Sequence, residues 1–162
     1  MNKLRVLLAD DHKIVREGLK LLVNSQPDME VVGEADNGRV AIALARELQP
    51  DVVVMDVSMP ELNGLEATKK LVRLYPEIKV LTLTRHADDG YLQQLLRAGA
   101  SGYVLKLSAA DELVRAIRAV VAGKIYLDPE MTEHIVEAAV GGGGGRGAAP
   151  PPPPTAPPPP PP

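Results

Sequence analysis

The sequence of 162 residues contains no cysteine, no tryptophan and no phenylalanine. The absence of cysteine excludes disulfide frameworks, thiolate metal sites and cysteine nucleophiles. Four tyrosines are the only aromatic residues, which is too few for base-stacking platforms or aromatic cages. No apolar run approaches the roughly 20 residues of a membrane-spanning helix, and two aspartates come before any signal-peptide core. We therefore expect a cytoplasmic protein without a membrane partner.

An excess of charge of one sign is also missing. The 18 basic and 21 acidic residues leave a formal net charge of -3 at pH 7. A chain that binds nucleic acid through its overall field needs a basic surface, which this composition does not provide. The length matches a single domain of ordinary size. We therefore expect one mildly acidic domain that does not bind DNA directly.

Glycine and proline are concentrated at the end of the sequence. Residues 141–162 contain 6 Gly and 11 Pro, with Arg146 as their only charge. Such a composition cannot bury enough apolar surface to offset the entropy cost of ordering. We predict that residues 141–162 form a disordered tail, with polyproline II where proline dominates. This tail is either a disordered chain end or a PxxP ligand.

Two hydrophobic periodicities alternate along residues 1–140. Short segments rich in valine and leucine are typical of strands, and amphipathic segments with helical spacing lie between them. This alternation predicts an α/β fold whose parallel sheet carries helices on both faces. Asp128 and Pro129 suit the N-cap and first position of a short helix reaching Val140. The predicted strands are Leu4–Ala9, Glu30–Ala35, Val52–Met55, Lys79–Thr84 and Gly102–Leu105.

Polar residues stand at the carboxyl ends of four predicted strands. These ends meet at one edge of a parallel sheet, where α/β proteins place their sites. Each residue alone has an ordinary explanation as a turn residue, a helix cap or a surface charge. Their joint position nevertheless indicates a site. The residues are Asp10 and Asp11 after the first strand, Asp56 after the third, Thr84 at the end of the fourth and Lys106 after the fifth.

Three carboxylates at one edge repel one another and need a cation or a proton as compensation. Their oxygens suit Mg²⁺, which binds one or two carboxylates and keeps positions for water and phosphate. Lys106 and Thr84 offer a cation and a hydroxyl to the oxygens of a phosphoryl group. The residues therefore favour phosphoryl transfer onto a carboxylate, with Asp56 as the nucleophile.

Four segments carry these residues: LLADDHKIVREGL, VVVMDVSMPELNGLEA, LTLTRHA and GASGYVLK. Over about residues 3–127, the sequence resembles the receiver domain of two-component response regulators, especially of the NarL/FixJ (LuxR-type) subgroup. The resemblance implies a flavodoxin-like, doubly wound sheet of five parallel strands in the order 2-1-3-4-5. It also implies a phosphorylation-dependent switch in a phosphorelay. We accordingly predict a receiver domain over residues 1–127.

The resemblance assigns a role to each residue at the sheet edge. Asp56 resembles the phosphoacceptor, and Lys106 resembles the phosphate-binding lysine. Asp11 resembles the direct Mg²⁺ ligand, and Asp10 resembles a ligand that acts largely through water. Together with Asp56, the backbone carbonyl of Ser58 would complete the protein ligands.

Thr84 and Tyr103 resemble a switch pair, in which the hydroxyl moves to the phosphoryl group and the aromatic ring turns inward behind it.

Three further residues stand next to these site residues in the sequence. Leu107 stands where many receivers have a proline preceded by a cis bond, so the isomer at this bond is left open. Arg85 stands where many receivers outside the subgroup have a small residue, and a long cation there could shield the acyl phosphate or alter its hydrolysis. His86 borders the predicted pocket.

The subgroup usually continues into a helix-turn-helix domain. The sequence contains no basic recognition helix, and residues 128–140 resemble the linker helix that leads to such a domain. The resemblance implies a sensor histidine kinase as partner and contact between two receivers as a further interaction. We expect a receiver from a transcriptional regulator, or else a stand-alone receiver that acts on a protein partner.

Three other functions fit parts of the pattern. A Mg²⁺-dependent aspartyl-phosphate phosphatase of the haloacid dehalogenase type needs a second aspartate where this chain has Ser58. An FMN-binding flavodoxin needs an anion-binding loop where this chain has two aspartates. A pseudo-receiver would not need the complete set of site residues. We therefore expect no enzyme activity beyond the domain's own phosphorylation and dephosphorylation.

Overall fold

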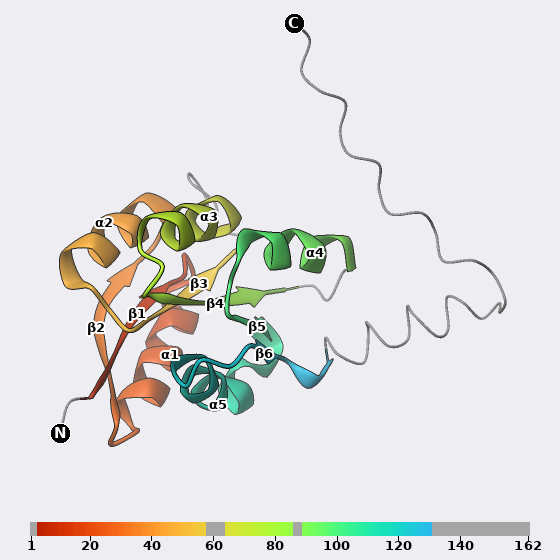
Figure 1. Cartoon of the computed structure of the whole chain (residues 1–162). Helices are drawn as coiled ribbons and strands as arrows, with labels where there is room; N and C mark the ends of the chain where they lie inside the picture. Colours follow the sequence, from red (N-terminus) through yellow and green to blue (C-terminus); the bar gives the residue numbers. More distant parts are fainter. Residues whose placement is uncertain (1–2, 58–63, 86–88, 131–162) are drawn as a thin grey trace, which may run out of the picture.

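The computed structural model describes residues 3–57, 64–85 and 89–130, which form a parallel sheet between two layers of helices (Figure 1). The strand order is β2-β1-β3-β4-β5-β6. Helices α1 and α5 cover one face of the sheet, and α2, α3 and α4 cover the other. The strands are β1 (Leu4–Ala9), β2 (Met29–Ala35), β3 (Val52–Asp56), β4 (Lys79–Thr84), β5 (Gly102–Leu105) and β6 (Tyr126–Leu127). The helices are α1 (Lys13–Asn24), α2 (Gly38–Leu48), α3 (Gly64–Leu74), α4 (Asp89–Ala98) and α5 (Ala109–Val121), with a 3-10 turn, η1, at Lys106–Ser108.

The sheet has one strand more than the five predicted. The first five strands follow the predicted order, and β6 extends the sheet beyond β5. Tyr126 donates its backbone N–H to the carbonyl of Ser101 at 2.9 Å, and Asp128 donates its own to Tyr103 at 2.8 Å. A strand of two residues is too short to produce a hydrophobic alternation, so no pattern in the sequence predicts it. The prediction of five strands was therefore wrong in the number of strands, because β6 adds a sixth at the edge of the sheet.

Strand β3 is buried on both faces because it lies inside the sheet. Val52 and Val54 pack with residues of α1 and α5, whereas Val53 and Met55 pack with residues of α2 and α3. A parallel sheet covered on both faces needs such a continuous apolar run. This packing holds the carboxyl end of β3, where Asp56 stands, between β1 and β4.

Asp128 connects the chain after β6 to the end of β5 through hydrogen bonds. Its side chain is buried, and its Oδ2 accepts a hydrogen bond from the backbone N–H of Leu105 at 3.1 Å. Its Oδ1 accepts from the backbone N–H of Glu130 at 2.9 Å, as an N-cap does for the first turn of a helix. The residue that begins the predicted C-terminal helix is thus bonded directly beside Lys106.

Several predictions fall partly or wholly outside the described residues. The helix expected to reach Val140 is described only at its start, and the Gly/Pro tail at 141–162 lies outside, as do Ser58 and His86. All peptide bonds of the described residues are trans, including the one before Leu107. None of the described helices has the length and apolar character of a membrane span.

Gly64 is expected to be essential for the packing of α3 against β3. A Cβ at this position would lie 2.1 Å from the backbone oxygen of Asp56 and 2.4 Å from the Cα of Val57. Because backbone atoms would have to move, Gly64→Ala should lower the free energy of unfolding by about 1–3 kcal/mol. The measurement is urea denaturation followed by circular dichroism.

Gly18→Ala is the matched control for this substitution. Gly18 lies inside α1, and its added Cβ would meet nothing within 4 Å. Alanine favours a helix interior over glycine, so this variant should gain roughly 0.5–1 kcal/mol. Equal stability of the two variants would contradict the close approach of Gly64 to β3.

Candidate functional site

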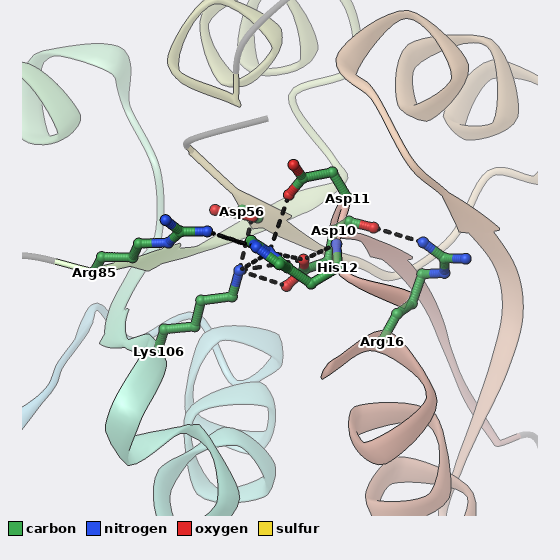
Figure 2. A network of polar contacts seen from close by, with 7 residues as sticks. All are labelled: Asp10, Asp11, His12, Arg16, Asp56, Arg85 and Lys106. Carbon is green, nitrogen blue, oxygen red and sulfur yellow. Dashed lines mark hydrogen bonds and ion pairs between the residues drawn. The ribbon is translucent and has the colours of Figure 1, made fainter. Parts of the chain in front are cut away.

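The ends of three strands bring an acidic pair, a further aspartate and a lysine together (Figure 2). Asp10 and Asp11 follow β1, Asp56 is the last residue of β3, and Lys106 follows β5. Strands β1 and β3 are neighbours, but β4 separates β3 from β5. Lys106 therefore uses the length of its side chain to reach the acidic residues across the end of β4.

Lys106 contacts two buried carboxylates at once. Its Nζ lies 2.9 Å from Oδ2 of Asp56 and 3.1 Å from Oδ2 of Asp10. The side chains of Asp56 and Asp10 are 0% and 1% exposed. Removing charges from water is costly unless they are paired, and one ammonium here serves two carboxylates. The pair of acids is therefore undercompensated by the lysine alone.

The surroundings of Asp10 act on its pKa in both directions. Burial raises the pKa of its carboxyl above the ordinary value of 3.8, and the charge of Asp56 raises it further. A hydrogen bond from the backbone N–H of His12, at 2.8 Å, and the ammonium of Lys106 act in the opposite direction. Oδ2 of Asp10 accepts no hydrogen bond from the described residues, although it lies beside Lys106. A buried anionic oxygen of this kind is suited to a cation.

His12 is a member of the site that sequence reasoning missed. Its Nδ1 lies 3.2 Å from Oδ1 of Asp11, 3.3 Å from Oδ1 of Asp10 and 3.0 Å from Nζ of Lys106. Its Nε2 lies 2.8 Å from Nη2 of Arg85. The available signal was its position directly after the acidic pair, at the N-cap of α1.

The acidic cluster has the chemistry of a metal site. Asp10, Asp11, His12 and Asp56 each offer one ligand atom, and these atoms lie within 4.8 Å of one another. Carboxylate oxygens with room for further oxygen ligands suit a hard cation such as Mg²⁺. The predicted ligands Asp10, Asp11 and Asp56 are thus brought together, whereas Ser58, predicted to contribute a carbonyl, lies outside the described residues.

The two residues of the predicted switch pair lie on neighbouring strands. Thr84, the last residue of β4, is buried at the same edge as Asp56. Tyr103 on β5 is also buried, but it packs with Val57 and Leu95 instead of joining the polar cluster. Its hydroxyl donates to the carbonyl of Ala100 at 2.6 Å, and burial raises its pKa to about 12. The aromatic ring is thus in an inward position in this structure.

Asp10→Asn is expected to stabilise the protein when divalent metal is removed. Because its pKa is raised in the folded state, ionised Asp10 opposes folding above that pKa, and this cost disappears as the pH falls below 3.8. At neutral pH in EDTA, the variant should gain about 1–3 kcal/mol over wild type. The advantage should vanish in acid, and thermal melts across pH are the measurement.

The same thermal melts, repeated with added Mg²⁺, test the metal site. Mg²⁺ should raise the melting temperature of wild type, because it binds the folded site; the effect is about 2.7 kcal/mol at 100 times the dissociation constant. Asp11→Asn should respond little to Mg²⁺ and gain less in EDTA than Asp10→Asn, because the Asp11 side chain is 29% exposed. Lower melting of both variants in EDTA, with a full Mg²⁺ response, would contradict the metal site.

Comparison with known proteins agrees with the geometry. The family model for the response regulator receiver domain matches residues 6–118. The chain is 46% identical over 132 residues to the response regulator GacA of Pseudomonas viridiflava, covering 82% of this chain and 62% of that protein. It is 44% identical over 138 residues to the oxygen regulatory protein NreC of Staphylococcus carnosus, covering 85% of this chain and 64% of that protein.

A solved structure shows the same fold at similar identity. The two-component response regulator of the LuxR family from Aurantimonas sp. SI85-9A1 has a TM-score of 0.81 and 40% sequence identity, covering 86% of this chain and 99% of that chain. The chain spans about three-fifths of the length of the curated relatives it matches. With its matched residues including the strand ends that build the acidic cluster, the chain belongs to the response regulator receiver domain family, among relatives of the NarL/LuxR group.

Proposed function

We propose that this chain is switched by phosphorylation of Asp56, with Mg²⁺ held by the neighbouring acids. The observation that carries the proposal is the contact of 2.9 Å between Nζ of Lys106 and Oδ2 of fully buried Asp56, beside a second buried carboxylate. Lys106 places a positive charge beside the carboxylate at the end of β3, a strand inside the sheet. The same ammonium can follow an incoming phosphoryl oxygen.

The proposed reaction is a transfer between two side chains. An oxygen of Asp56 forms a bond to phosphorus, and the bond from phosphorus to the imidazole nitrogen of a phosphohistidine breaks. The electron pair of that bond stays with the imidazole. Asp10 and Asp11 would hold Mg²⁺ beside Asp56, together with the carbonyl of Ser58. When bound, the metal supplies positive charge to the phosphoryl oxygens as they approach the carboxylates.

Thr84 and Tyr103 are the proposed response to phosphorylation. Thr84 is buried at the end of β4, which pairs with both β3 and β5. Its hydroxyl can donate to a phosphoryl oxygen on Asp56, and Tyr103 would adjust behind it where it packs with Leu95 of α4. Since the Tyr103 ring is already inward, the shift that we expect is a change of packing around the ring and not a large rotation from solvent.

The partners are inferred from the same family. A sensor histidine kinase is the proposed phosphodonor, and contact between two receivers is a further proposal. We propose a receiver at residues 1–127, a linker helix at 128–140 and a disordered tail at 141–162. Relatives such as DegU of Brevibacillus brevis are named as transcriptional regulatory proteins. We propose that this receiver likewise controls transcription, without direct contact of residues 1–162 with DNA.

Phosphorylation of Asp56 is testable without knowledge of the kinase. With Mg²⁺ and acetyl phosphate, the chain should gain one phosphoryl group, measured by intact mass spectrometry. The acyl phosphate should be lost on treatment with hydroxylamine, and Asp56→Asn should gain none. Asp111→Asn, which alters an exposed aspartate of α5, is the matched control and should be labelled like wild type. A label that resists hydroxylamine, or one that persists in Asp56→Asn, would refute the assignment.

A further inference from the structure

Arg85 and His12 meet over the strand that carries Asp56 (Figure 2). Arg85 directly follows β4, and His12 lies in the turn after β1. Since β3 lies between β1 and β4 in the sheet, a contact between these two residues spans the end of β3. Nη2 of Arg85 lies 2.8 Å from Nε2 and 3.3 Å from Nδ1 of His12.

The distances define the arrangement of this contact. Because Nη2 of Arg85 lies close to both ring nitrogens of His12, the guanidinium stands against the face of the imidazole. Nδ1 of the same ring lies 3.2 Å from Oδ1 of Asp11 and 3.0 Å from Nζ of Lys106. The imidazole therefore lies between Arg85 and the acidic side of the site.

A cavity lies directly outside Lys106. It has a volume of about 440 Å³ and is lined by His12, Val15, Arg85, Lys106 and Leu107. Lys106 joins it to Asp56, whose side chain has no exposed surface. The imidazole and the guanidinium thus border the space next to Lys106, which contacts the proposed phosphoacceptor.

We propose that Arg85 and His12 form a clasp that limits access to Asp56. This inference rests on the proposed function, because it concerns the exchange of a phosphoryl group at that residue. In the closed state, the clasp hinders the approach of a phosphodonor to Asp56. After phosphorylation, the clasp hinders the approach of water to the acyl phosphate. Arg85 and His12 thus act by their position beside Asp56 and take no part in the bond changes.

The hydrolysis that the clasp slows has a simple balance. A water oxygen bonds to phosphorus while the bond from phosphorus to the Asp56 oxygen breaks. The electron pair of the broken bond returns to the carboxylate, and the proton of the attacking water passes to the released phosphate or to solvent. Both this step and the forward transfer need an in-line path to phosphorus, so opening the clasp should accelerate both.

Arg85→Ala is the central test, because a change of charge and a change of access have opposite effects. Loss of an attracting cation would slow the reaction with the anionic donor acetyl phosphate. Loss of a clasp should accelerate phosphorylation and dephosphorylation, each by about fivefold, which corresponds to about 1 kcal/mol. Both rates are measured at saturating Mg²⁺ by mass spectrometry. Arg46→Ala, at an exposed arginine of the last turn of α2, should match wild type.

His12→Ala and the double variant decide whether the two residues act as one unit. His12→Ala should accelerate both rates as Arg85→Ala does, and the double variant should be no faster than either single variant. Additive effects in the double variant would overturn the clasp, as would a slower or unchanged phosphorylation of Arg85→Ala.

Carbodiimide labelling tests the clasp independently of phosphorylation. In the unphosphorylated chain, the carboxylate of Asp56 should be modified about fivefold faster in Arg85→Ala than in wild type, a factor equal to about 1 kcal/mol. Peptide mapping by mass spectrometry measures this rate. Equal labelling would refute the clasp. Faster labelling in a chain that acetyl phosphate does not phosphorylate would support the clasp and refute the proposed function.

Discussion

The ammonium of Lys106, shared between the buried carboxylates of Asp56 and Asp10, is the interaction on which the site depends. Two carboxylates about 4 Å apart repel by roughly 4 kcal/mol at an effective dielectric constant near 20, and one cation cannot fully cancel two anions in its vicinity. Such a group of carboxylates suits a divalent cation, and the proposed phosphorylation of Asp56 would change the charge of the site again.

The sheet supplies the rigidity that keeps these charges together. Apolar side chains of β3 are buried on both faces, and the carbonyl of Asp56 is approached so closely at Gly64 that a Cβ does not fit. Repulsion among the acids therefore cannot be relieved by a drift of the strand end. Burial, and to a smaller extent the charge of Asp56, raises the pKa of Asp10, and such a group of acids suits a bound cation.

The end of β5 connects the site with the chain that follows the receiver. Tyr103 and Lys106 lie on or next to this strand, and Asp128 bonds the backbone N–H of Leu105 between them. The same carboxylate caps the start of the next helix at Glu130. Lys106 and Tyr103 therefore lie close to the buried side chain that holds the start of the next helix.

The sequence pattern by itself determined the α/β fold and the edge at which the functional residues meet, and the resemblance to receiver domains implied the order of the first five strands. Hydrophobic periodicity is a local property, and the carboxyl ends of parallel strands must share an edge, so Asp10, Asp11, Asp56 and Lys106 could be grouped from their positions alone. Only the tertiary structure decided how the charges pair. The reach of Lys106 across β4, the place of His12 between the acids and Arg85, and the short strand β6 each depend on contacts between residues far apart in the sequence. Such contacts leave no periodic pattern, because a single side chain or two paired residues are enough to make them.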